Sequence, residues 1–304
     1  MAFEKFPQIA CITRPVPHQV KAMAPIARQL REAGYRVRET FDRCPPEAIV
    51  FCWGNGWAKE IRAVHPNVVI CVLDHGLFHP RKKYVVSGWQ GLNGWGEHPV
   101  VDDGGARLRA KGWDAVVEPT RVVSKPGRTV LLLGQVYGDA AIVDAVEDYG
   151  DWLKRMADSY ASEGARVVFR PHPVQARNGL DRYPNVGARV SHERPIFEDF
   201  AEASTVVAMN SNGLSDALMY GVQDIRLFNR GSMLWPISQP TEHPDRPGER
   251  KVIYSKRQKL AERLAYCQWE PEEIDNGEWI KYHSPIMQRI YNQHQTSRWY
   301  DTWL

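Results

Sequence analysis

The sequence predicts an α/β protein of two doubly wound domains, each built on a mainly parallel sheet. Two features support this prediction. Short apolar runs alternate with segments of helical spacing along most of the chain, and strands that alternate with helices form parallel sheets. The 304 residues are also enough for two domains that each bury a core, and a hydrophobic content of 43% argues against disorder.

The first half of the chain repeats a strand pattern and a helix pattern. Apolar residues recur three and four positions apart from Val20 onward, and Gly34 ends this expected helix. The third and fourth strand patterns run into the polar turns Gly54-Asn55-Gly56 and Asp74-His75-Gly76. Strands are expected at 8–12, 35–39, 48–53 and 68–73. This alternation predicts the first parallel sheet.

The regular pattern fades between Phe78 and Lys125, which predicts a functional loop region or an unusual linker. The crossover to a second domain is expected at 119–127. In the second half, strands are expected at 129–133, 165–169, 187–190 and 205–209, and helices at 140–162, 196–203 and 214–220. The expected parts are therefore a first domain at 1–125, a second domain at 126–255, and a helical tail at 256–304 that packs back across the first domain.

Two polar turns in the second half directly follow apolar strands. Phe169-Arg170-Pro171-His172-Pro173 ends one strand, and the segment 210–218 ends another and opens an amphipathic helix. Ligands bind at strand ends that face helix N-termini, because backbone N–H groups and the helix dipole favour a phosphate there. His172 and Ser211 are the expected hydrogen-bond donors to a diphosphate. Structural roles stay open as alternatives: His172 as a rigid loop residue, and Ser211 and Asn212 as helix caps.

Three motifs in this order resemble the C-terminal half of GT-B glycosyltransferases of the capsule-polysaccharide-synthesis type. They are Gly134-Gln135-Val136-Tyr137-Gly138-Asp139-Ala140-Ala141-Ile142, Arg170-Pro171-His172-Pro173, and the segment from Ser211 to Gly221. The tail at 260–279 and Asp74-His75-Gly76 are similar to glycosyltransferases encoded by bacteriophages. The resemblance implies a GT-B fold with two Rossmann-like domains. It also implies a nucleotide-sugar donor, with a UDP-sugar expected.

The resemblance further assigns the donor site. It implies donor-binding roles for Gln135, Asp139, Arg170, His172, Ser211, Asn212, Gly213 and Asp216. Asp139 could instead cap the following helix. Two departures from the family leave the identity of the donor open. Asp216 replaces the Glu that reaches the nucleotide ribose and is one methylene shorter, and Gln223 stands where the family has Pro.

An inverting transfer needs a base that deprotonates the acceptor hydroxyl and hydrogen-bond donors that hold the departing diphosphate. Asp74, at the end of a buried strand of the first domain, is the expected base, and His75 is the alternative. Arg170, His172 and Ser211 are expected to hold the diphosphate. Because GT-B enzymes of both stereochemical outcomes share this frame, a retaining reaction stays open.

The acceptor is expected at loops of the first domain where aromatic and basic residues gather. The acceptor-binding candidates are Trp53, Arg81, Lys82, Lys83, Trp89 and Trp95, with more basic residues at 107–111. Aromatic rings stack on sugars and on unpaired bases, and basic residues bind phosphate backbones. Together with the phage resemblance, this favours sugar transfer to hydroxymethylated pyrimidine bases of duplex DNA, flipped out of the helix.

Three alternatives to the DNA acceptor stay open. The first is a glycosyltransferase of surface or capsular polysaccharide synthesis, and the second is a nucleotide-binding protein without transferase activity. The third concerns the charges alone, which could form a solvated face. The formal net charge of +3 permits a polyanionic acceptor without requiring one.

No metal or other cofactor is expected. The five cysteines show no C-x-x-C spacing, which favours neither a disulfide framework nor a zinc site. Asp102-Asp103 precedes Gly104-Gly105 and so has the composition of a solvated turn rather than of a metal-binding carboxylate pair. No apolar run reaches the length of a membrane span, and the first five residues lack a secretory apolar region. A cytoplasmic location is therefore expected.

Overall fold

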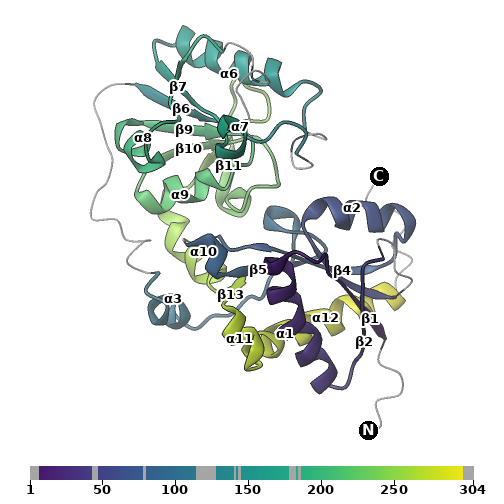
Figure 1. Ribbon diagram of the computed structural model, residues 1–304. Coiled ribbons are helices and arrows are strands. Elements are labelled where there is room, and N and C mark those ends of the chain that lie inside the picture. Colours follow the sequence, from purple (N-terminus) through teal and green to yellow (C-terminus); the bar gives the residue numbers. More distant parts are fainter. Residues whose placement is uncertain are drawn as a thin grey trace. The chain divides into compact units, whose positions relative to one another are not determined.

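The computed structural model describes residues 7–42, 47–77, 80–113, 128–139, 142, 145–177, 183 and 186–296 (Figure 1). The chain divides into two compact units. The first unit comprises residues 1–102 and 263–304, and the second unit comprises residues 103–262. The expected crossover at 119–127 and Cys44 lie outside the described residues. The domain boundary expected at residue 125 therefore stays a prediction.

The first unit is built on a six-stranded sheet with the order β13-β5-β4-β3-β1-β2. Four neighbouring strands are parallel, whereas β5 runs antiparallel to β4 and β13 runs antiparallel to β5. The strands are β1 (Gln8–Ile12), β2 (Arg36–Thr40), β3 (Ile49–Trp53), β4 (Val69–His75), β5 (Val85–Trp89) and β13 (Gln268–Trp269). The helices are α1 (Pro17–Glu32), α2 (Asn55–Val64), α11 (Pro271–Asp275) and α12 (Glu278–Thr296), with 3-10 turns at Arg81–Lys83 and Asn93–Trp95.

The C-terminal tail completes the core of the first unit. Strand β13 extends the sheet by pairing with β5, α11 packs against α1, and α12 packs against α1 and β4. Trp269 and Trp279 are fully buried in this core. In Figure 1 the yellow tail helices lie beside the purple N-terminal elements. The expectation that the tail packs back on the first domain is confirmed.

Strand β5 corrects one expectation, because the segment from Phe78 to Lys125 was expected to lack regular structure. The run Val85-Val86-Ser87-Gly88-Trp89 is short and contains a small polar residue and a glycine, so its strand character is weak locally. Pairing with β4 on one side and with β13 on the other makes it a strand. Gly88 also allows close approach, since an added Cβ would lie 2.2 Å from the carbonyl oxygen of Gly91.

The second unit is built on a seven-stranded sheet with the order β11-β12-β10-β9-β6-β7-β8. The five strands from β10 to β8 are parallel, and β12 and β11 continue the sheet in antiparallel fashion. The strands are β6 (Thr129–Leu133), β7 (Arg166–Arg170), β8 (Arg189–Val190), β9 (Thr205–Ala208), β10 (Asp224–Leu227), β11 (Ser238–Pro240) and β12 (Arg250–Val252). The fold-class prediction of two mainly parallel α/β domains is thus confirmed.

The helices of the second unit lie in the segments that connect its strands. They are α3 (Ala106–Ala110), α6 (Tyr149–Ser162), α7 (Pro173–Arg177), α8 (Ile196–Glu202) and α9 (Gly213–Tyr220), with 3-10 turns at Trp235–Ile237 and Tyr254–Lys256 and with α10 (Arg257–Leu264) at the boundary of the units. Within the segment 140–162, where one helix is expected, α6 begins at Tyr149, and the Asp148 side chain caps it by accepting from Asp151 N at 2.9 Å.

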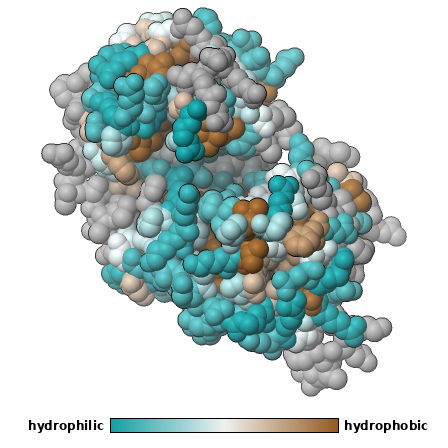
Figure 2. Space-filling model, viewed as in Figure 1, coloured by the Kyte–Doolittle hydropathy of each residue, from teal (hydrophilic) through white to brown (hydrophobic). Residues whose placement is uncertain are grey.

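Among the described residues, none of the helices has the length and apolar composition needed to cross a bilayer. On the face that Figure 2 shows, hydrophilic side chains surround small apolar patches. Open α/β sheets bind ligands at the carboxyl ends of their parallel strands.

Candidate functional site

Three polar turns follow the neighbouring strands β9, β6 and β7 of the second sheet. We call these three turns the second edge. Gln135, after β6, and Asn210, after β9, are both buried and hydrogen-bonded to each other twice. The Gln135 amide donates to Asn210 Oδ1, and Asn210 N donates to Gln135 Oε1 at 3.2 Å. The Gln135 side chain therefore joins two turns, and its expected direct contact with the donor stays a prediction.

Tyr183 joins the turns after β6 and β7. Its hydroxyl donates to the carbonyl oxygen of Gln135 at 2.6 Å and accepts from His172 N at 3.4 Å. Gly134 N also donates to Arg170 O at 2.7 Å, and an added Cβ on Gly134 would lie 3.0 Å from the Phe169 ring. Sequence reasoning missed Tyr183, because a single tyrosine in a connection carries no periodic or motif signal.

His172 follows β7 and is partly buried. Its Nδ1 accepts from the backbone N–H of Val174 at 3.2 Å. In the neutral ring the proton therefore resides on Nε2, which makes that nitrogen a hydrogen-bond donor. A phosphate oxygen accepts hydrogen bonds, so it can bind to the protonated Nε2 of this tautomer.

Ser211, Asn212 and Gly213 form the turn that opens α9. Ser211 Oγ accepts from Gly213 N at 3.2 Å, and its hydroxyl proton has no acceptor among the described residues. Gly213 lies so close to β6 that an added Cβ would be 2.9 Å from Leu133 Cδ1. Asn212 occupies the N-cap position without a side-chain cap bond, and Asp216 lies in the first turn of α9. Ser211 thus caps the helix through its oxygen and keeps an O–H to donate, so both expected roles are compatible.

Arg170 ends β7, and Asp139 lies in the turn after β6. The Arg170 guanidinium forms an ion pair of 2.5 Å with the fully buried carboxylate of Asp199 and donates to Arg194 O at 2.9 Å. It therefore holds the segment after β8, and its expected contact with a phosphate stays a prediction. Asp139 is exposed, and its carbonyl oxygen accepts from Ile142 N at 2.9 Å. Both the donor contact and the capping role expected for Asp139 stay predictions.

Three aromatic rings meet at the carboxyl ends of β1, β3 and β4, which we call the first edge. The centroid of His75 lies 4.9 Å from that of His18 and 5.3 Å from that of Trp53, and the His18 and Trp53 centroids are 5.1 Å apart. His75 ends β4, Trp53 ends β3, and His18 lies in the first turn of α1. Sequence reasoning missed His18, whose only signal is its place at the start of the helix after the first strand.

The electrostatics of the first edge favour a neutral His75. Burial is the main cause that lowers the pKa of His75, and the neighbouring His18 and Lys82 lower that pKa further, against an opposing effect of Asp74. The ring is therefore neutral near pH 7 and able to accept a proton.

Asp74 and His75 lie on opposite faces of the sheet. Leu73 belongs to the core that packs against α1, and side chains alternate along a strand, so His75 shares that face and Asp74 does not. The Asp74 carboxylate accepts from the backbone N–H of His75 at 2.7 Å. The two candidate bases are therefore alternatives rather than a cooperating pair.

The expected acceptor-binding residues do not all reach the surface. Trp89 is completely buried, and its Nε1 donates to His283 Nδ1 at 3.1 Å, so the prediction that it stacks on an acceptor is wrong. Its alternating position in β5 directs it into the core. Trp53 is partly exposed at the first edge, and Trp95 is 48% exposed in its 3-10 turn.

The basic residues expected to bind DNA are divided between the units. Arg81, Lys82 and Lys83 form a 3-10 turn of the first unit, where Lys83 forms an ion pair of 3.0 Å with Glu270. The basic residues at 107–111 lie on and just after α3, in the second unit. The two groups therefore do not form one continuous segment of either unit.

The Asp102-Asp103 pair behaves as a turn. Asp103 accepts from Gly105 N and from Arg107 N, each at 2.8 Å, and so caps α3. Within the described ranges, His, Cys, Asp and Glu side chains form no group of three that could hold a metal ion.

Comparison with known proteins shows what this chain is similar to. No protein-family model and no curated protein matches the sequence. Two solved structures from Thermosulfurimonas dismutans are similar in fold, each at 14% sequence identity. The KpsC beta Kdo 2,4 transferase has a TM-score of 0.57 and covers 93% of this chain and 97% of its own. The KpsC beta Kdo 2,7 transferase has a TM-score of 0.53 and covers 88% of this chain and 97% of its own. The chain therefore has the GT-B fold, with two Rossmann-like domains.

Proposed function

We propose that the protein is a metal-independent glycosyltransferase that takes its sugar from a nucleotide-sugar donor held at the second edge. The observation that carries this proposal is the turn geometry there. The Gln135–Asn210 pair and Tyr183 fix turns that present a donor tautomer of His172 and a Ser211 hydroxyl with a proton to donate. Such groups hold the oxygens of a departing diphosphate without a metal ion.

The proposed reaction is an inverting transfer with His75 as the base. The acceptor oxygen bonds to the anomeric carbon, its proton passes to His75, and the bond between the anomeric carbon and the diphosphate oxygen breaks. The neutral state of His75 and its contact with the His18 and Trp53 rings support this assignment over Asp74. A sugar ring stacks readily on such aromatic side chains.

We propose a glycan acceptor, as in surface or capsular polysaccharide synthesis. Two observations support a glycan over duplex DNA. The similar solved structures are both named as Kdo transferases. Of the residues expected to bind DNA, Trp89 is buried in the core and Lys83 forms an ion pair with Glu270. The expected UDP-sugar remains the first donor to test.

The experiment offers labelled nucleotide sugars of several bases, in EDTA, to oligosaccharides, to hydroxymethylcytosine and hydroxymethyluracil DNA, and to unmodified DNA. Label on the oligosaccharides alone is the expected result. Label on hydroxymethylated DNA alone would replace the glycan acceptor by DNA. If the protein bound the nucleotide but neither transferred nor hydrolysed the donor sugar, it would be a nucleotide-binding protein without transferase activity.

A further inference from the structure

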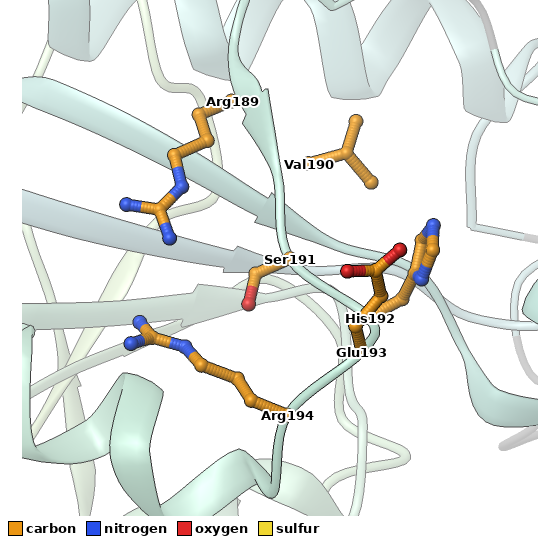
Figure 3. A pocket seen from close by; sticks show the side chains of 6 residues that line it. All are labelled: Arg189, Val190, Ser191, His192, Glu193 and Arg194. Atoms are coloured by element: carbon orange, nitrogen blue, oxygen red, sulfur yellow. The ribbon is translucent and has the colours of Figure 1, made fainter.

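A hollow of about 310 Å³ lies beside the outer strand β8 of the second unit, which pairs with β7. It is lined by the single segment 189–194. Figure 3 shows the guanidinium groups of Arg189 and Arg194 on one side of this segment with the Ser191 hydroxyl between them, and His192 on the other side. The hollow therefore has a cationic side built from two arginines.

The segment that carries these arginines is fixed in place. Strand β8 pairs with β7 in register, with Val168 opposite Arg189 and Phe169 opposite Val190. Ser191 N donates to Phe169 O at 2.8 Å, and Ser191 Oγ donates to the buried Asp199 carboxylate at 2.8 Å. A ligand would thus meet a backbone that is already ordered.

The Arg194 guanidinium is held by two carboxylates. Its Nε donates to Asp199 at 2.7 Å, its Nη2 lies 2.5 Å from the same carboxylate, and its Nη1 donates to Glu202 at 2.7 Å. These three contacts leave two of its five N–H groups for another acceptor. Arg189 is exposed and has no hydrogen bond or ion pair with any described residue.

Positive charge exceeds negative charge in this cluster. Asp199 is shared by Arg170 and Arg194, and Glu202 is shared by Arg194 and Arg166. Two carboxylates therefore face three arginines, and the other charged groups that line the hollow are one more arginine, Arg189, and one more carboxylate, Glu193. An arginine fork binds planar or tetrahedral oxyanions by two parallel hydrogen bonds, and a second guanidinium nearby strengthens that binding.

We propose that Arg189 and Arg194 form a second anion-binding site at the carboxyl end of β8, which takes the phosphate or carboxylate group of an acidic ligand. This site is additional to the one proposed for the donor diphosphate. It does not depend on the transferase activity.

The test is a titration of isotope-labelled protein, followed by the backbone amide signals of residues 189–194. The probes are inorganic phosphate, glucuronate as a carboxylated sugar, and glucose as a neutral control. We expect these signals to shift with phosphate, with glucuronate or with both, and not with glucose. Arg189→Gln should weaken the binding about tenfold or more, and Arg189→Lys should weaken it less, because lysine keeps the charge but loses the fork.

The matched control is Arg155→Gln. Arg155 is likewise exposed, lies on α6 of the same unit, and has no hydrogen bond or ion pair with a described residue. Equal weakening by Arg155→Gln and Arg189→Gln, or signals at 189–194 that do not move with either anion, would overturn the proposal. A shift with phosphate alone or with glucuronate alone supports the site and identifies the group it takes. Unchanged nucleotide binding by Arg189→Gln would separate this site from the donor site.

Discussion

The carboxyl edges of the two sheets are built from different chemistry. At the first edge, the rings of His18, Trp53 and His75 meet without a hydrogen bond between them, and one of the histidines is kept neutral by burial. At the second edge, buried amides and the Tyr183 hydroxyl join the turns through hydrogen bonds. The first edge is suited to proton transfer and sugar stacking, and the second to holding a charged leaving group.

This difference shows how one topology can carry two tasks. Both edges lie where parallel strands end, which explains why ligand-binding groups gather at each. The side chains that follow the strands then decide the task. Removing a residue at the first edge should therefore affect the rate of transfer, whereas removing one at the second edge should affect nucleotide affinity or stability.

The largest expected effect is on the catalytic rate. His75→Gln should lower kcat by roughly 10²-fold or more, because the base acts on the acceptor in the transition state. The Kd of the nucleotide should change little. Because the pKa of His75 is lowered, wild-type activity should persist to below about pH 6.5 and fall only in more acidic buffer. Initial rates across pH 5–8 measure both effects.

Asp74→Asn is the matched variant for this prediction. The carboxylate is on the opposite face, so the variant should retain most of the turnover. A severe loss of kcat in Asp74→Asn, with near-normal turnover in His75→Gln, would assign the base to Asp74.

The next effect is on stability. Asn210→Ala removes the Oδ1 acceptor of the buried Gln135 side-chain amide but keeps the backbone N–H that donates to Gln135 Oε1, and the unpaired amide N–H costs about 1–3 kcal/mol. The exposed His18 should be replaceable by Ala with a change within about 0.5 kcal/mol. Hydrogen exchange resolved by unit compares the two variants. Equal destabilisation would contradict the contrast between a hydrogen-bonded edge and an aromatic one.

The smallest effect is a difference in acid sensitivity between the units. His283 in the first unit is fully buried, burial holds its pKa well below the usual value, and its Nδ1 accepts from Trp89. The unfolded chain therefore protonates His283 more readily than the folded chain does. The contribution of His283 to the free energy of unfolding is complete above about pH 6.5 and is lost as the pH falls below that value. In the second unit the pKa of Asp224 and that of Glu202 are lowered, so their contribution is lost only in more acidic solution, below about pH 4.5.

His283→Gln tests this difference. Glutamine can accept from Trp89 and donate to Ser87 without titrating near neutral pH, so the variant should lose stability less steeply between pH 7 and pH 5. Hydrogen exchange of the first unit across that range is the measurement. An unchanged pH dependence would show that another group controls it.

The parts of the molecule that the sequence revealed are those that depend on local pattern. Apolar runs that end in polar turns located most strands and put His172 and Ser211 at strand ends. The misses depend on partners far along the chain. Strand β5 depends on β13, about 180 residues later. Trp89 was expected to stack on an acceptor, but it is buried and donates its N–H to His283, 194 residues later.

The central claim, that the second edge binds the nucleotide while the first edge acts on the acceptor, is tested most directly by calorimetry. The nucleoside diphosphate of the active donor, UDP first, is titrated in EDTA into the wild type, His172→Ala and His75→Gln. We expect binding without a metal, a loss of about 1–3 kcal/mol in His172→Ala, and unchanged affinity in His75→Gln. Undiminished binding by His172→Ala, or a loss confined to His75→Gln, would contradict the claim and place the nucleotide elsewhere.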